Sequence, residues 1–142
     1  MKLRLATRDD ERWINERYAS VHFQLSDLSR DLMVVAEVDG VPAGIGRLVP
    51  GGDDACELGG MHVLEEFRGR GIARAIVDEL LRHANGREVY CIPFADLEPI
   101  YAAAGFVRIE PRDDHPPYVR EKLAWCAREI PDRAVILMKL GR

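Results

Sequence analysis

The sequence has few cysteines, few lysines and no long apolar run. Its three cysteines, Cys56, Cys91 and Cys126, lie far apart and include no Cys-x-x-Cys pair. This spacing argues against a disulfide framework and a cysteine-based zinc site, and it favours a reducing compartment. No stretch resembles a signal peptide, and no apolar run approaches the ~20 residues that a membrane-spanning helix needs. We therefore expect a cytoplasmic protein without a membrane contact or a resident metal.

The charge balance is acidic. The chain has a formal net charge of −4 and a pI of about 5.6, whereas general nucleic-acid binders are usually basic. Nucleic acid is therefore not an expected partner. Lysine occurs only at Lys2, Lys122 and Lys139, so arginine supplies most of the positive charge. With 142 residues, 47% hydrophobic and 31% charged, the chain has the size and composition of one globular domain spanning 1–142.

Hydrophobic periodicity and turn residues predict an α/β (α+β) fold, a mixed sheet flanked by helices. Asp39-Gly40 is a strong hairpin signal and 50–54 is a second turn, so three consecutive strands should form an antiparallel meander. Gly59-Gly60 inside a strand indicates a bulge, and 24–30 is a loop or a short helix. Strands are expected at 2–7, 32–38, 41–49, 56–64, 87–92, 106–109 and 133–140, and helices at about 9–22, 72–84, 97–104 and 118–129.

The stretch from Cys56 to Ala84 reads as strand, glycine-rich turn and amphipathic helix. Its turn consists of Arg68, Gly69, Arg70, Gly71, Ile72 and Ala73. Glycines allow close backbone approach, and the first amides of a helix point outward without a partner, so the turn predicts a phosphate site. A P-loop would need Lys-Ser/Thr after its last glycine, and a dinucleotide fingerprint would lie near the first strand of a βαβ unit. This turn fits neither.

Two elements resemble the GNAT family of acyl-CoA N-acyltransferases. One is Arg68-x-x-Gly71-x-Ala73, preceded by Glu57-Leu58-x-x-Met61-x-Val63, and the other is the segment from Ile100 to Phe106, which ends in Gly-Phe. The resemblance implies a mostly antiparallel sheet that is splayed at its central strands. It also implies acetyl-CoA as co-substrate and a primary amine, on a small molecule or a protein, as acceptor. Homodimers are common in the family, and the segment after the first helix helps to shape the acceptor pocket.

The same resemblance assigns the contacts to acetyl-CoA. The pyrophosphate would bind the amides of residues 68–73. The pantetheine arm, which resembles a peptide, would pair with the backbone of Met61, His62 and Val63 where the strand splays from its neighbour. One backbone amide there would stabilise the negative charge on the thioester oxygen. The side chain of His62, by alternation, faces away from Met61 and Val63, which favours a packing or surface role.

Tyr101 matches by position the tyrosine of the family that assists the departing thiolate. A phenol of pKa ~10 is a weaker acid than a thiol of ~8.5, so complete proton transfer in water is uphill by ~2 kcal/mol. Tyr101 would therefore act by donating a hydrogen bond, or with a lowered pKa. The alternative is a core tyrosine packed with its helix neighbours.

Glu57 is the candidate general base for the amine. A free glutamate of pKa ~4.3 is far too acidic to deprotonate an alkylammonium of ~10.4 unless burial raises its pKa. Otherwise Glu57 only binds the cation. A solvent-facing strand glutamate is the alternative.

Some features depart from the family or leave its function open. Phe94 stands where many members have an asparagine that contacts the cofactor. Either Asp96 or the Phe94 backbone compensates, or that contact is missing. Cys91 is expected to be buried and inert rather than a nucleophile. A non-catalytic acyl-CoA-binding regulator that acts on a protein partner is the main alternative to an enzyme. A nucleotide- or phosphate-binding module is a further one.

Overall fold

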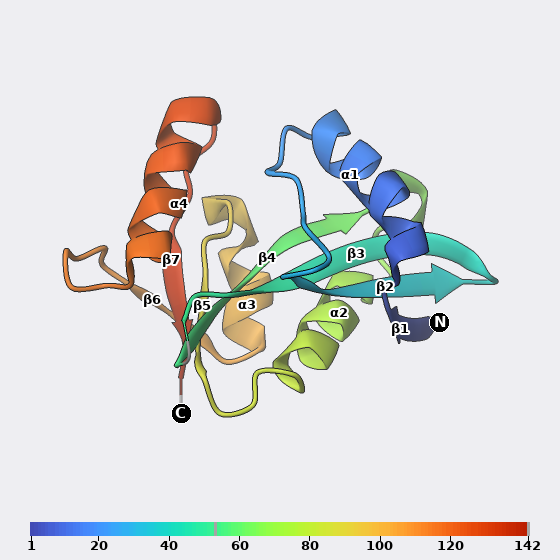
Figure 1. Cartoon of the computed structure of the whole chain (residues 1–142), viewed down its shortest axis with the longest axis horizontal. Coiled ribbons are helices and arrows are strands. Elements are labelled where there is room, and N and C mark those ends of the chain that lie inside the picture. The colour runs from blue at the N-terminus through green and yellow to red at the C-terminus, as the bar shows by residue number, and fades with distance from the viewer. Residues whose placement is uncertain (53, 142) are drawn as a thin grey trace.

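The computed structural model describes residues 1–52 and 54–141 (Figure 1). Its strands are β1 (Lys2–Leu5), β2 (Leu32–Val38), β3 (Val41–Pro50), β4 (Ala55–Val63), β5 (Glu88–Cys91), β6 (Phe106–Ile109) and β7 (Leu137–Leu140). Its α-helices are α1 (Glu11–Ser20), α2 (Ile72–Leu81), α3 (Glu98–Ala103) and α4 (Pro117–Glu129), and short 3₁₀ helices span Arg8–Asp10, Glu65–Phe67 and Ala95–Leu97.

The described strands form one sheet in the order β1-β2-β3-β4-β5-β7-β6. Only β4 and β5 pair in parallel, and every other neighbouring pair is antiparallel. The expected mixed, mostly antiparallel sheet is therefore confirmed. Helices α1 and α4 lie on one face of the sheet and α2 and α3 on the other, with the chain termini toward opposite ends (Figure 1).

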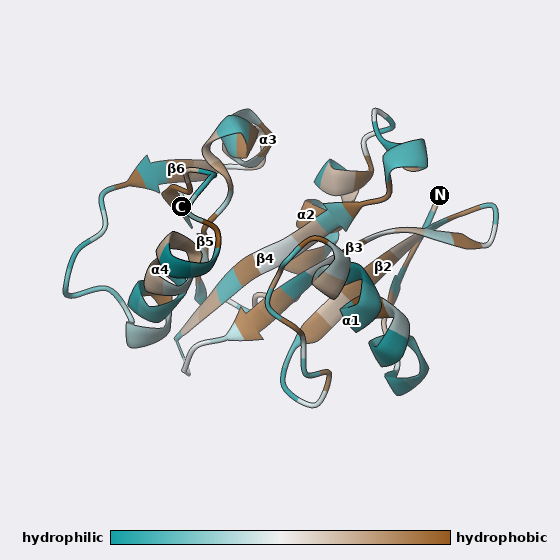
Figure 2. Cartoon of the chain, turned by 90° about the horizontal axis from the view of Figure 1, so that it is seen from above, coloured by the Kyte–Doolittle hydropathy of each residue, from teal (hydrophilic) through white to brown (hydrophobic). Residues whose placement is uncertain are grey.

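Each face of the sheet has its own apolar packing. The largest cluster lies under α2 and α3 and includes Leu58, Ile76 and Leu80, all with no exposed surface. On the other face, α1 packs on β2 and β3 through Ile14 and Tyr18, while α4 packs over β5 and β7 in a separate cluster. Viewed from above, the strands are largely hydrophobic, whereas α1 and α4 turn hydrophilic residues outward (Figure 2). Helices α1 and α4 thus cover different parts of the same face, α1 over β2 and β3 and α4 over β5 and β7.

Most predicted elements are present, but some boundaries are wrong. The central helix ends at Leu81 rather than near residue 84, and the last strand begins at Leu137 rather than near 133. After α2, Asn85 and Gly86 adopt the left-handed conformation in which Asn and Gly commonly end a helix. Segment 24–30 contains no helix. Position 53 of the predicted turn at 50–54 lies outside the described residues.

The Gly59-Gly60 bulge is confirmed by the register of β3 against β4. Arg47 pairs with Gly59 but Ile45 pairs with His62, so β4 carries one more residue than β3 between these two pairs. Gly60 adopts φ of 59°, which strains any residue with a Cβ atom. A Cβ at Gly60 would also clash with the Tyr18 hydroxyl, so both the backbone conformation and the packing require glycine at this position.

Strands β4 and β5 separate beyond the pair formed by Leu58 and Cys91. After Cys91 the chain turns to residues 134–136 instead: the Ala95 amide donates to the Ala134 carbonyl at 2.9 Å, and the Ile136 amide donates to the Pro93 carbonyl at 3.0 Å. Among the described strands, none pairs with this edge of β4 from Gly59 to Val63. The expected splay at the central strands is therefore present.

Candidate active site

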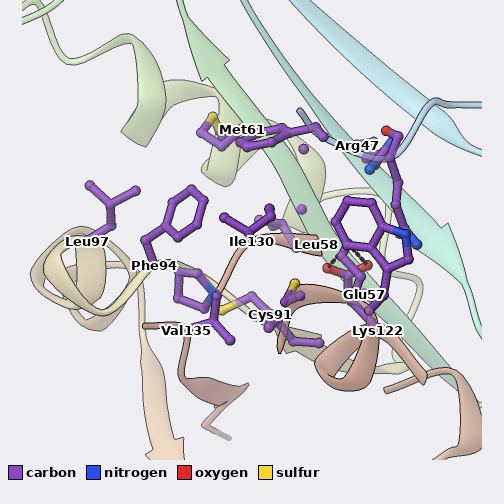
Figure 3. Close-up of a pocket in the computed structure, with 18 of the residues that line it drawn as sticks. Arg47, Glu57, Leu58, Met61, Cys91, Phe94, Leu97, Lys122, Ile130 and Val135 are labelled. Atoms are coloured by element: carbon purple, nitrogen blue, oxygen red, sulfur yellow. Dashed lines mark hydrogen bonds and ion pairs between the residues drawn. The ribbon is translucent and has the colours of Figure 1, made fainter. Parts of the chain in front are cut away.

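A pocket lies where β4 and β5 separate. Its inner part, a cavity of about 70 Å³, is lined by β4, by the segment after β5, and by α3 and α4 (Figure 3). A broader groove of about 830 Å³ adjoins it between α4 and the segment 23–31 that follows α1. The inner pocket and the outer groove share six lining residues: Phe23, Gln24, Arg47, Glu57, Lys122 and Trp125. The segment after α1 thus helps to form the groove.

Tyr101 lies on α3 and lines the inner pocket. It is 4% exposed, and its ring packs edge-on against Phe106 with the centroids 6.0 Å apart. Burial raises the pKa of Tyr101 well above its ordinary value, with smaller contributions from Cys91 and Glu57. At neutral pH the phenol is therefore protonated and available as a hydrogen-bond donor. This environment does not support the lowered pKa that the sequence left open.

Glu57 also lines the inner pocket, from β4. It is 4% exposed, so the solvent-facing alternative is wrong. Its partner is Lys122 of α4, whose Nζ lies 3.4 Å from each carboxylate oxygen. Figure 3 shows the two side chains meeting on the same side of the pocket as Arg47, opposite Phe94 and Leu97. Pairing with the ammonium allows the carboxylate to be buried.

The open edge of β4 carries the residues expected to meet the pantetheine arm. Met61 and Val63 pack against the cluster under α2, whereas His62 lies near Arg17 of α1 on the opposite face. Burial lowers the pKa of His62 below its ordinary value of 6.5, and the cations Arg68 and Arg17 lower it further. The predicted orientation of His62 is confirmed, and the imidazole is neutral at pH 7.

The glycine-rich turn leads into α2 as expected. Gly69 and Gly71 adopt φ of 80° and 76°, and no atom of the described residues lies within 4 Å of a Cβ added at either position. Among the described residues, the amides of 69–73 have no acceptor outside α2. The amide of Arg68 differs, because it donates to the Glu65 carbonyl at 3.2 Å. Of the amides predicted to bind a phosphate, that of Arg68 is therefore already paired, whereas no described acceptor outside α2 pairs with those of 69–73.

The Arg68 side chain is partly engaged in this state. Its Nε donates to the Val63 carbonyl at 3.1 Å, which ties the turn to the end of β4. Arg70 places its guanidinium 5.4 Å from the centroid of the Phe67 ring. Both arginines are exposed, so their charges face solvent beside the helix N-terminus. The turn therefore combines free amides with two accessible cations.

Phe94 and Asp96 both contact Arg133. The Asp96 carboxylate accepts from Arg133 Nη2 at 2.9 Å. Asp96 directly precedes the helix expected at 97–104, where an aspartate favours an N-cap, but its side chain caps no helix. The Phe94 carbonyl accepts from the Leu97 amide at 2.9 Å. The Arg133 guanidinium stacks 3.5 Å from the centroid of the Phe94 ring. Phe94 therefore belongs to the apolar wall of the pocket.

Cys91 is 1% exposed, and burial strongly raises the pKa of its thiol, so it is no activated nucleophile. Across residues 1–52 and 54–141, His, Cys, Asp and Glu side chains form no group of three that could hold a metal ion. Nor does any described helix combine the length and the hydropathy that crossing a bilayer requires.

Two pocket residues were missed from the sequence, Lys122 and Arg47. A signal existed for Lys122, because it falls three residues after Val119 and four before Cys126, on the buried face of α4. Arg47 is a charged residue within a run of β3 that is buried from residue 43 to residue 48. A charge inside a strand covered on both faces is unusual without a partner or a function.

Comparison with known proteins agrees with this architecture. The model of the acetyltransferase (GNAT) family matches residues 3–106. Rv2747 from Mycobacterium tuberculosis, solved in complex with CoA and NLQ, is 22% identical with a TM-score of 0.79, over 100% of this chain and 99% of that one. A GNAT family acetyltransferase from Elizabethkingia anophelis with acetyl-CoA bound is 14% identical with a TM-score of 0.70, over 99% and 97% of the two chains.

A third similar structure is N-acetylglutamate synthase from Neisseria gonorrhoeae, complexed with coenzyme A and L-arginine. It is 16% identical with a TM-score of 0.72, and the match covers 99% of this chain and 33% of that one. No curated protein sequence matches the chain. At these identities the structures show a common fold, and the family model covers more than half of the sequence. The chain therefore belongs to the GNAT acetyltransferase family.

Proposed function

We propose that the chain transfers an acetyl group from acetyl-CoA to a primary amine, by direct attack within a ternary complex. One observation carries the proposal. The open edge of β4, the phenol of Tyr101 and the carboxylate of Glu57 all line the same pocket. Matched proteins from M. tuberculosis and E. anophelis were solved with CoA and acetyl-CoA, which supports the choice of donor.

The residues present suit this donor. The free amides of 69–73 and the α2 dipole favour a pyrophosphate. The unpaired edge of β4 at Met61, His62 and Val63 offers backbone groups to the two amides of a pantetheine arm. Following β4 from the turn back toward Gly59 leads to the inner pocket. The thioester would therefore arrive beside Tyr101 and Glu57.

The chemistry divides between two side chains. As the amine nitrogen bonds to the acetyl carbon and the carbon–sulfur bond breaks, Tyr101 donates a hydrogen bond to the departing sulfur. Glu57 binds the acceptor as its ammonium, and the amine that attacks has first lost one proton to water. After the attack the nitrogen releases a second proton, through Glu57 or a water, and this proton passes to the departing sulfur, so that CoA leaves as the thiol. A backbone amide of β4 stabilises the charge that builds on the thioester oxygen.

Release of free thiol from acetyl-CoA across a panel of primary amines tests this proposal. We expect at least one small-molecule or protein amine to raise the rate well above hydrolysis, with an equivalent amount of N-acetylated amine formed. Gly71→Asp, which places a side chain and a negative charge at the helix N-terminus, should abolish the rate at low acetyl-CoA. Binding of acetyl-CoA without amine-dependent thiol release by any amine would favour a non-catalytic regulator instead.

A further inference from the structure

Arg47 is a buried cation with unused hydrogen-bonding capacity. It is 3% exposed, and Nη1 donates to the Gln24 carbonyl at 2.9 Å. Nε is buried and has no hydrogen-bond partner among residues 1–52 and 54–141. The guanidinium carbon lies 4.6 Å from the centroid of the Tyr18 ring, which fixes its position. Of the residues that the structure describes, none places a carboxylate within ion-pair distance of Arg47.

This cation borders both the inner pocket and the outer groove. Figure 3 shows Arg47 on the same side of the pocket as the pair formed by Glu57 and Lys122. The charges at this junction are therefore two cations, Arg47 and Lys122, against one carboxylate, Glu57. Burying a charge without an opposite charge is costly, so an anion entering the pocket would relieve the imbalance.

The bulge in β4 brings Arg47 and Glu57 within reach of one small molecule. A Cβ on Gly59 would lie 2.5 Å from Glu57 Oε2, and a Cβ on Gly60 would lie 2.9 Å from Arg47 Nε. The two functional groups thus flank consecutive residues, whose Cα atoms are ~3.8 Å apart. A ligand with an amine and an anion only a few bonds apart can address both.

We propose that the acceptor is a free amino acid whose carboxylate is recognised by Arg47. This inference rests on the proposed function and names its substrate class. The planar guanidinium suits a carboxylate, and the amine is then directed toward Glu57. A polyamine or the ammonium of a protein lysine side chain would instead bring further positive charge against Arg47 and Lys122. The amino-acid side chain is accommodated by the outer groove.

The test compares matched acceptors that differ only in the carboxylate. L-Leucine, L-glutamate and L-methionine are each assayed as the free acid, the α-carboxamide and the decarboxylated amine. For at least one side chain, wild-type kcat/KM should favour the α-carboxylate over the carboxamide by about 10- to 150-fold, the size of one charge-assisted contact. Arg47→Gln should remove this preference, mainly through KM, and Arg47→Lys should retain part of it.

Arg12→Gln is the matched control, because Arg12 lies on α1 with a side chain 93% exposed and forms an ion pair with Glu16 on the same helix. It should keep the wild-type preference. Equal use of acids, amides and amines by the wild type would overturn the proposal, whether or not Arg47→Gln folds. So would an Arg47→Gln protein that folds normally and keeps the carboxylate preference.

A binding experiment tests the carboxylate site independently of the proposed acetyltransferase activity. In the presence of CoA, an N-acetyl amino acid should raise the melting temperature of the wild type more than its carboxamide, and Arg47→Gln should lose that difference. If no amine releases thiol, the proposed function fails, while this comparison still decides the carboxylate site. No difference between acid and amide in the wild type would overturn the site.

Discussion

The Lys122 ammonium lies 3.4 Å from both oxygens of the Glu57 carboxylate, joining α4 to β4 across the pocket. The side chains are 16% and 6% exposed, so the pair is largely removed from water. Lys122 lies beyond residues 3–106, the part that the family model matches. The positive charge that meets Glu57 therefore comes from the part of the chain that follows the segment matched by the family model.

The ion pair predicts a non-additive effect on stability. Lys122→Met should lower the free energy of unfolding by about 3 kcal/mol, because it leaves a buried carboxylate without its partner. The double variant with Glu57→Gln should recover much of that loss. Urea denaturation of the wild type, both single variants and the double variant measures the coupling. Strictly additive effects would show that the two charges do not interact.

The turn before α2 predicts a loss of donor binding in Gly71→Asp. Gly71 and Gly40 both adopt φ near 77°, with no atom within 4 Å of an added Cβ. Gly40→Asp, in the β2–β3 hairpin, thus imposes a similar backbone strain far from the turn. Acetyl-CoA at 100 times its dissociation constant should stabilise the wild type and Gly40→Asp by ~2.7 kcal/mol.

The same ligand should stabilise Gly71→Asp far less. Acetyl-pantetheine, which lacks the pyrophosphate, should have little effect on any of the three proteins. Thermal melting with each ligand makes the comparison. Equal stabilisation of the wild type by the two ligands would contradict a phosphate site at this turn.

The bulge predicts that Gly60→Ala is more destabilising than Gly69→Ala. Both glycines have positive φ, at 59° and 80°. At Gly69 the added methyl meets open space, so the cost is the backbone strain of ~1–2 kcal/mol. At Gly60 the methyl would lie 2.4 Å from the Tyr18 hydroxyl, which already donates to the Gly60 carbonyl at 2.7 Å. Similar urea midpoints for the two variants would argue against a tightly packed bulge.

The lowered pKa of His62 predicts a pH-dependent stability. Below the ordinary value of 6.5 the unfolded chain binds a proton at this histidine more readily than the folded chain. Its contribution to the free energy of unfolding is therefore complete above 6.5 and declines as the pH falls below that value. Urea titrations at several pH values should show that the free energy of unfolding falls less steeply below pH 6.5 in His62→Asn than in the wild type. An equally steep fall would mean that neither burial nor the cations Arg68 and Arg17 lower the pKa of the imidazole.

Local patterns made much of the fold predictable. The Asp39-Gly40 hairpin, the two glycines of the turn and the double glycine of the bulge each require a backbone that few residues adopt, so the sequence marks them directly. The predicted ends of helices and strands were wrong where contacts between distant segments determine the local structure. Residues 134–136 look like a strand but pair with 93–95, and Asp96 looks like a helix cap but pairs with Arg133.

The sequence predicted only those residues of the candidate site that lie in local sequence motifs. Tyr101, Glu57 and the turn at 68–73 lie in motifs whose residues are close in sequence. Arg47 and Lys122 reach the pocket from β3 and α4, and their roles depend on the separation of β4 from β5. No local pattern specifies which charge will meet Glu57, so these two residues emerged only from the folded arrangement.

The measurement that tests the central claim most directly is the turnover of Tyr101→Phe. The change removes one hydroxyl and keeps the ring that packs against Phe106. With the best amine, kcat should fall by roughly 10²- to 10⁴-fold, the range for one positioned acid–base group. The affinity for acetyl-CoA should stay near that of the wild type, because the interaction is made chiefly in the transition state. Tyr90→Phe, at a tyrosine that is equally buried at 4% exposure but outside the pocket, should turn over normally. If Tyr101→Phe turns over as fast as the wild type, the tyrosine is a core residue and the account of catalysis is wrong.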